Sequence, residues 1–167
     1  MTVFEFQRGS NTNSTLSIKQ KNATNYSVIA AESFRAGSGS SQDECQTGVG
    51  WLPAGKYDIV LHVHTYNATI KGRVWQLSDK RCNGGTGTLR TELFIHTEET
   101  ADAGQACIAG NPDAPYCWEG DNDYYSAGCI KLAHRKYSND IYRASLDWDS
   151  WDGRHGAFTA SNRLTVF

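Results

Sequence analysis

The sequence predicts a mainly β fold, sandwich-like or barrel-like, with one or two short helices, in a single domain that spans residues 1–167. Short runs of β-branched and aromatic residues are separated by Gly, Asn, Ser and Thr, which is the pattern of strands joined by turns. The composition, 39% hydrophobic and 20% charged residues, is that of a folded chain. A length of 167 residues suits one domain with a sizeable core.

The expected strands follow from alternating apolar positions. The strand at 56–66 is the clearest, with Ile59, Leu61 and Val63 expected on one face and Val60, His62 and His64 on the other. The segment 70–78 is expected to be its hairpin partner. The other expected strands lie at 14–20, 25–34, 89–98 (ending at His96) and 163–167.

The remaining segments are expected to be irregular or helical. Residues 35–48 predict a surface loop, residues 80–88 a turn, and residues 98–123 a long loop rich in Gly, Pro and Asp. Ser138 is a candidate helix N-cap, and Ile141, Ala144 and Leu146 follow at helical spacing.

Charge and hydropathy exclude several partners. The net charge is −2 and the basic residues are scattered, so nothing indicates a nucleic-acid partner. No apolar run has the roughly 18 residues of a membrane span. The opening residues lack the features of a signal peptide, so an exported protein would be a mature form. No cofactor is expected, and the pair His62 and His64 has no evident third ligand, so no metal site is expected.

Five cysteines indicate an oxidising compartment and leave one thiol over. Cys107 and Cys117 bracket a short Pro-containing loop and are suited to a local bridge, which would leave Cys45 to pair with Cys82. The alternative is that all five cysteines are reduced and buried.

The unpaired thiol would be Cys129, in the stretch SAGCIKL. A cysteine acts as a nucleophile when a base lies beside it, and His96 at the end of an apolar strand is the candidate base. Gly128 lets the backbone approach closely, so the amides of Gly128 and Cys129 are candidates to bind a developing oxyanion. The alternative is a buried structural thiol and a core histidine.

These residues also carry a resemblance to a known family. FIHTEE followed by SAGCIKL resembles the catalytic signature of the L,D-transpeptidases, the YkuD-type cysteine enzymes of bacterial peptidoglycan, in which a histidine at a strand end precedes a Ser-His-Gly-Cys-Ile-Arg-Leu string. The upstream GWLPAGKYDI resembles the Pro-Gly segment of that family. The chain departs from the pattern at Ala127, where the family has a second His, at Lys131, where Arg is common, and at Thr97, where Gly follows the first His.

The resemblance implies the L,D-transpeptidase catalytic fold and a role for each matching residue. Cys129 would form the acyl-enzyme and His96 would be its base, while Ser126 and Gly128 would shape the turn. Lys131 or Arg90 would meet a substrate carboxylate. Aromatic residues near the cysteine would either line a substrate groove or pack a lid onto the body; they are Trp118, Tyr124 and Tyr125.

The implied function is L,D-transpeptidation of peptidoglycan stem peptides through a cysteine thioester, in the periplasm, at the cell wall or after secretion. Water in place of an acceptor amine would make the protein an L,D-carboxypeptidase or endopeptidase, and an antibacterial effector of this kind would have an immunity protein or a wall-associated protein as partner. The other alternative is a non-catalytic wall-binding domain, in which Ala127 marks lost catalysis.

Overall fold

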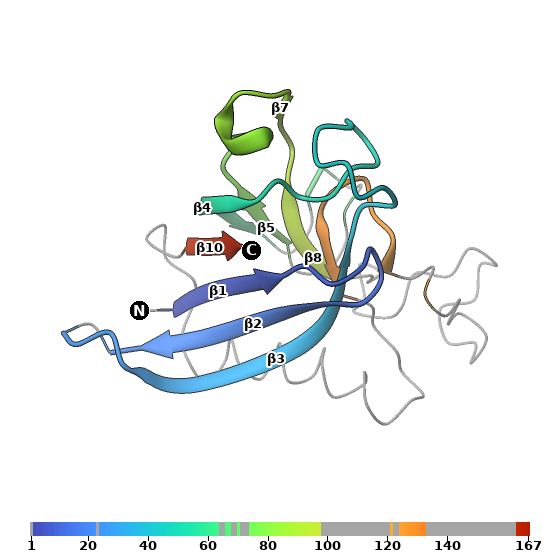
Figure 1. The fold of residues 1–167 in the computed structure, drawn as a ribbon. Helices are drawn as coiled ribbons and strands as arrows, with labels where there is room; N and C mark the ends of the chain where they lie inside the picture. The colour runs from blue at the N-terminus through green and yellow to red at the C-terminus, as the bar shows by residue number, and fades with distance from the viewer. Residues whose placement is uncertain are drawn as a thin grey trace.

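The computed structural model describes residues 2–22, 24–63, 66–67, 70, 74–97, 121, 124–132 and 163–167. Eight strands close into a barrel in the order β1-β10-β4-β5-β8-β9-β3-β2 (Figure 1). Neighbouring strands are antiparallel except for the pairs β1–β10 and β8–β9, which are parallel. The barrel strands are β1 (Thr2–Gln7), β2 (Ser14–Lys21), β3 (Val28–Ser38), β4 (Gly55–Val63), β5 (Val74–Leu77), β8 (Phe94–Thr97), β9 (Ile130–Leu132) and β10 (Arg163–Val166).

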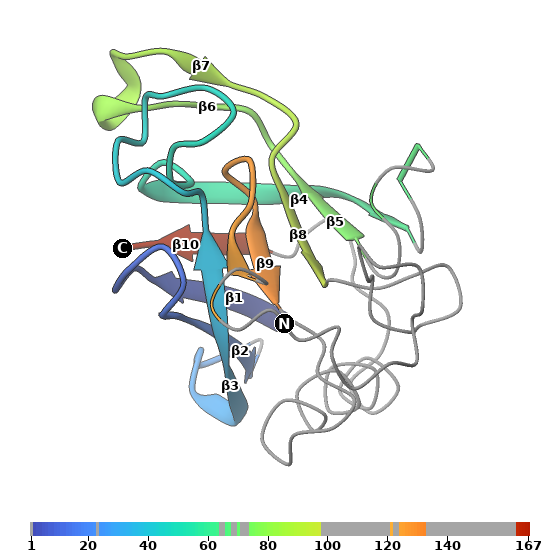
Figure 2. The same cartoon turned by 90° about the vertical axis from the view of Figure 1, so that its right-hand side faces the viewer.

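A small ribbon extends from one end of this barrel. Strands β6 (Lys80–Arg81) and β7 (Leu89–Arg90) pair with each other around a single 3-10 turn, η1 (Asn83–Gly85). The ribbon lies at the same end as the 39–54 loop and the turn that precedes β9 (Figure 2). The prediction of a mainly β fold is therefore confirmed, while the specific L,D-transpeptidase fold stays a prediction. Among the described residues, no helix is long and apolar enough to cross a membrane.

The core fills the inside of the barrel. Cross-strand partners Phe4 and Ile18, and Phe4 and Leu164, show how alternate residues of each strand meet there. Among the described residues, Trp75 is the largest fully buried side chain. The core consists of Phe4, Phe6, Leu16, Ile18, Phe34, Ala36, Leu52, Tyr57, Ile59, Trp75, Leu77, Leu93, Ile95, Ile130, Leu132, Leu164 and Val166.

The facing predicted for β4 is wrong beyond Ile59. The pairing with β5 shifts register between Ile59 and Leu61, which is a β-bulge, so the side chains after it change faces. Leu61 is consequently 39% exposed, whereas His62 stacks on the core Trp75 with ring centroids 4.8 Å apart. The predicted antiparallel pairing of the two segments is confirmed.

Strand β3 runs further than predicted, into the segment expected to be a loop. It pairs with β2 as far as Ala36, and Gly37 and Ser38 then pair with β9. Gly37 allows this crossing because a Cβ there would lie 2.2 Å from the Tyr124 carbonyl oxygen. The close approach of the segment before Cys129 to β3 thus depends on a residue without a side chain.

The segment predicted as one strand at 89–98 is two strands, β7 and β8. Glu92 interrupts them with a φ of +52°, a left-handed conformation that is unusual for a residue with a long side chain. Strands β1 and β9 were not predicted. The candidate helix beginning at Ser138 lies outside the described residues.

Candidate active site

The structure places His96, in β8, and Cys129, the residue just before β9, on the same face of the barrel. Strands β8 and β9 are parallel, with Ile95 opposite Ile130 and His96 opposite Lys131. Ile95 and Ile130 enter the core, so the residues one position away from them point to the outer face of the barrel. His96 and Cys129 are therefore on one face, one diagonal step apart in the register, and His96 is half-buried.

The thiol of Cys129 is free and only 7% exposed. It packs against Val74 of β5 and Phe94 of β8, two buried residues on the outer face of the barrel. Tyr66 and Ile70, from the β4–β5 connection, lie against this cluster, and the Tyr66 ring is 4.7 Å from that of Phe94. The buried cluster that contains Cys129 thus packs against side chains about 60 residues away in the sequence.

The surroundings of this thiol favour its neutral form. Burial raises the pKa of Cys129 to about 11; a main-chain hydrogen bond from Phe94 and the charge of Arg90 oppose the rise, and the Glu92 carboxylate adds to it. The thiol donates a long hydrogen bond to the Glu92 carbonyl oxygen, with an Sγ–O distance of 3.9 Å. In this state Cys129 is a protonated thiol at neutral pH, not a thiolate.

Ser126 organises the turn that precedes the cysteine. Its hydroxyl donates to the Cys129 carbonyl oxygen at 2.6 Å and accepts from the amides of Gly39 at 3.0 Å and Gly128 at 3.3 Å. Gly128 has a φ of +110°, where a side chain would be strained. Because its amide already donates to Ser126, Gly128 does not present a free oxyanion donor in this conformation.

Arg90 does not fit its predicted role as a ligand for a substrate carboxylate. The residue is 2% exposed, and its guanidinium is directed at main-chain carbonyl groups of the neighbouring loops. It donates to the carbonyl oxygens of Glu44 (2.6 Å), Trp51 (3.3 Å), Gly50 (3.4 Å) and Ala127 (3.5 Å). This correction follows from burial: the guanidinium is already occupied by the protein's own backbone.

The loop on which Arg90 rests is cross-linked to the β6–β7 ribbon. Cys45 and Cys82 form a disulfide, which confirms that predicted pair; the second predicted pair, Cys107 and Cys117, lies outside the described residues. Gly87 packs against the bridge, since a Cβ there would lie 2.3 Å from the Cys82 sulfur.

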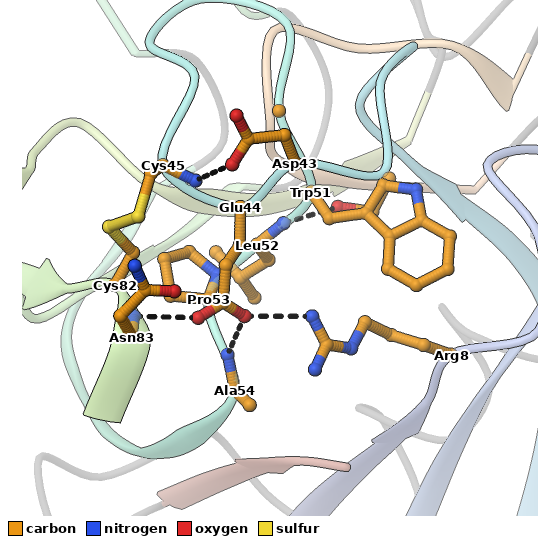
Figure 3. Close-up of polar contacts among 12 residues, drawn as sticks. Arg8, Asp43, Glu44, Cys45, Trp51, Leu52, Pro53, Ala54, Cys82 and Asn83 are labelled. Atoms are coloured by element: carbon orange, nitrogen blue, oxygen red, sulfur yellow. Dashed lines mark hydrogen bonds and ion pairs between the residues drawn. A yellow bond between two sulfur atoms is a disulfide. The ribbon is translucent and has the colours of Figure 1, made fainter. Parts of the chain in front are cut away.

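Glu44 provides a second connection beside the disulfide, and no signal in the sequence marked it. Its carboxylate accepts from the Arg8 guanidinium at 2.9 Å and from the amides of Ala54 at 3.0 Å and Asn83 at 2.8 Å (Figure 3). Partial burial alone would raise the Glu44 pKa, but the two amides and Arg8 outweigh it, so the pKa lies below its ordinary value. Glu44 therefore joins the loop, the ribbon and the end of β1.

The other predicted substrate residues lie around the same turn. Tyr125 is 42% exposed next to Ser126, and Lys131 is half-buried in β9 beside His96. Tyr124 is fully buried, with the Arg35 guanidinium 4.2 Å above its ring, so it packs the turn onto β3 and does not line a groove. Trp118 and His64 lie outside the described residues. In the described part of the chain, no group of three or more His, Cys, Asp or Glu residues is placed to hold a metal ion.

No protein-family model matches this sequence, and no curated protein matches it either. The fold and the site define a mainly β protein with a closed barrel, in which a free buried cysteine lies on the same face as a histidine of the adjacent parallel strand.

Proposed function

We propose that the protein is a cysteine-dependent acyl transferase that acts on peptidoglycan stem peptides by L,D-transpeptidation. The observation that carries the proposal is the placement of His96 and Cys129 on one face of the parallel pair β8–β9. His96 lies in β8 and Cys129 directly precedes β9, and two groups held at such fixed positions suit proton transfer from a nucleophile to its base. The SAGCIKL string and its resemblance to the L,D-transpeptidase signature supply the substrate class.

The reaction begins with the neutral thiol. His96 takes the proton from Cys129 as the sulfur attacks the carbonyl carbon of the L,D peptide bond. The C–N bond then breaks, the imidazolium returns the proton to the departing D-Ala amine, and a thioester remains on Cys129. An acceptor amine attacks this thioester, loses a proton and forms the crosslink, while the thiol is regenerated.

Burial imposes one requirement on this scheme. Cys129 is 7% exposed, so its thiol cannot meet a peptide without displacement of the residues around it. The packing of Tyr66 and Ile70 against the cluster that contains Cys129 would then open before acylation. The free cysteine beside one formed disulfide accords with a periplasmic, wall-associated or secreted location.

The test is acylation of Cys129, read by intact-mass spectrometry and peptide mapping. The protein is exposed to a stem tetrapeptide with an acceptor amine and, separately, to a carbapenem, the β-lactam class that the resemblance indicates as a thiol-directed probe. We expect one adduct, on Cys129, and a loss of several orders of magnitude in turnover for Cys129→Ser, which keeps the size of the buried group. A loss smaller than about tenfold would exclude the covalent mechanism.

The same thioester allows hydrolysis, which would make the protein an L,D-carboxypeptidase or a trimming endopeptidase. Product analysis with and without the acceptor amine separates the two outcomes. A crosslinked dimer that forms only with the amine supports transfer, whereas a trimmed stem in both reactions supports hydrolysis.

A non-catalytic wall-binding domain is the second candidate function, favoured by the burial and the raised pKa of Cys129. In that case a stem peptide binds with the same affinity before and after alkylation of the thiol, and no adduct forms. Calorimetric titration of the native and the alkylated protein with the peptide distinguishes this candidate from the enzyme.

A further inference from the structure

The turn before Cys129 is held from both sides. On one side lies the Ser126 hydroxyl, with two hydrogen bonds inside the turn and a third from the Gly39 amide, just after β3. On the other lies the Arg90 guanidinium, which donates to the Ala127 carbonyl oxygen and lies close to Gly128: a Cβ at position 128 would lie 2.3 Å from Arg90 Nη2. The glycine is thus required by its contact with Arg90 as well as by its φ.

The other donors of Arg90 hold a loop that is itself fixed. The shortest bond, 2.6 Å, goes to the Glu44 carbonyl oxygen, next to the disulfide at Cys45, and two longer bonds go to the carbonyl oxygens of Gly50 and Trp51. The side chain of Glu44 is anchored in turn by Arg8 and two amides (Figure 3). A guanidinium has N–H donors in several fixed directions, so it can donate at the same time to carbonyl groups of the 44–51 loop and of the 126–128 turn.

We propose that Arg90 is a positioning residue for Cys129, and that its guanidinium clamps the 126–128 turn to the disulfide-bonded 44–51 loop and so fixes where the thiol lies beside His96. The consequence for catalysis rests on the proposed function, whereas the clamp does not. The positive charge of Arg90 also favours the thiolate, which is consistent with its place beneath the turn. Arg90 touches no reacting atom in this arrangement, and the clamp that we propose is its geometric contribution.

The test compares two readouts in three variants. Arg90→Met removes the charge and all donors but keeps an unbranched side chain, and Arg90→Lys keeps the charge but supplies donors from a single point. Arg81→Met is the matched control, because Arg81 lies on the paired strand β6, is exposed, and donates to one carbonyl oxygen, that of Gly87, at 3.1 Å. The readouts are the rate of Cys129 alkylation by iodoacetamide, located by peptide mapping, and acyl transfer to the amine acceptor.

A lost clamp moves the two readouts in opposite directions. Without the charged hydrogen bonds the turn opens more often, so alkylation of the buried thiol is expected to rise about ten- to a hundredfold in Arg90→Met. Acyl transfer is expected to fall about a hundredfold, since a displacement near 1 Å is enough for such a loss. Arg90→Lys is expected to show the same two changes in smaller size, and Arg81→Met neither.

Alkylation that stays within about twofold of the parent in a folded Arg90→Lys or Arg90→Met protein overturns the clamp. An equal rise in Arg81→Met also overturns it, because loosening of the whole ribbon would then explain the effect. If Arg90→Met does not fold, the Arg90→Lys protein decides. A parent protein without acyl transfer, combined with faster alkylation in the Arg90 variants, supports the clamp and counts against the proposed function alone.

Discussion

The protonation state of Cys129 gives the sharpest prediction, because burial favours the neutral thiol whereas the proposed reaction requires a nucleophilic sulfur. Burial raises the pKa of Cys129 to about 11, from an ordinary value of 9.0. Only the thiolate reacts with iodoacetamide, so at pH 8 about 0.1% of the buried thiol is reactive, against about 10% of an ordinary one. We therefore expect alkylation at pH 8 to be at least about a hundredfold slower than in the same protein unfolded in urea.

The assay is the rate of Cys129 modification from pH 6 to pH 11.5, measured by peptide mapping. The logarithm of the rate is expected to rise by one for each pH unit until the pH nears 11. His96→Gln is the matched control and should leave the profile unchanged, because a neutral resting thiol does not depend on an imidazolium.

A plateau reached below pH 8 and lost in His96→Gln would refute this reasoning. It would mean that Cys129 and His96 form an ion pair in the resting protein and that the burial of the thiol does not govern its reactivity. Fast alkylation at neutral pH with no dependence on His96 would refute the burial of the thiol itself.

Four further predictions concern what holds the site in place. Glu44→Ala removes the acceptor of three hydrogen bonds, so it is expected to lower the free energy of unfolding, measured by urea titration, by about 3 kcal/mol. The expected loss for Glu44→Gln is about 1 kcal/mol. A loss below about 0.5 kcal/mol for Glu44→Ala, as for a surface ion pair, would contradict the role given to Glu44. The Glu44 pKa is lower in the folded protein than in the unfolded chain, so the ionised Glu44 carboxylate stabilises the fold above the unfolded-state pKa. This stabilisation is lost as the pH falls through the folded-state pKa. The Glu44→Gln protein should therefore lose less stability than the parent between about pH 5 and pH 3. Replacing Cys45 and Cys82 by Ser opens a loop with a sequence separation of 37 and should cost about 4 kcal/mol in the chain-entropy model; an unchanged midpoint in urea without reductant would argue against the bridge. Gly37→Ala places a Cβ 2.2 Å from the Tyr124 carbonyl oxygen, so a fall of several degrees in the melting temperature is expected, and an unaltered one would show that this approach is looser than described.

The strands with regular alternation were predictable from local pattern, and the departures from that pattern were not. The segment at 14–20 became β2 because its alternation persists along the whole strand. In β4 the pattern is equally clear, yet one bulge after Ile59 moves Leu61 outward and His62 onto Trp75. A bulge is set by pairing with a neighbouring strand, and single-strand periodicity carries no information about it.

The residues of the site show a similar division. The sequence placed His96 and Cys129 at strand ends, and the parallel pairing of β8 with β9 brings them to one face. It did not indicate that Tyr66 and Ile70, far away along the chain, pack against the buried cluster that contains Cys129. An arginine near a candidate active site suggests an anion ligand, and only the position of the 44–51 loop reveals that Arg90 is occupied by carbonyl groups.

The parallel pair β1–β10 bears on the order in which the chain can fold. Strand β10 lies between β1 and β4, so its four residues pair with two strands that both precede it by about 100 residues or more. Until Val166 is in place, β1 and β4 each present an unpaired edge, and unpaired edges are templates for pairing with other chains. Barrel closure is therefore a late, long-range step, and we expect the nascent protein to depend most on chaperones in the interval before β10 is inserted.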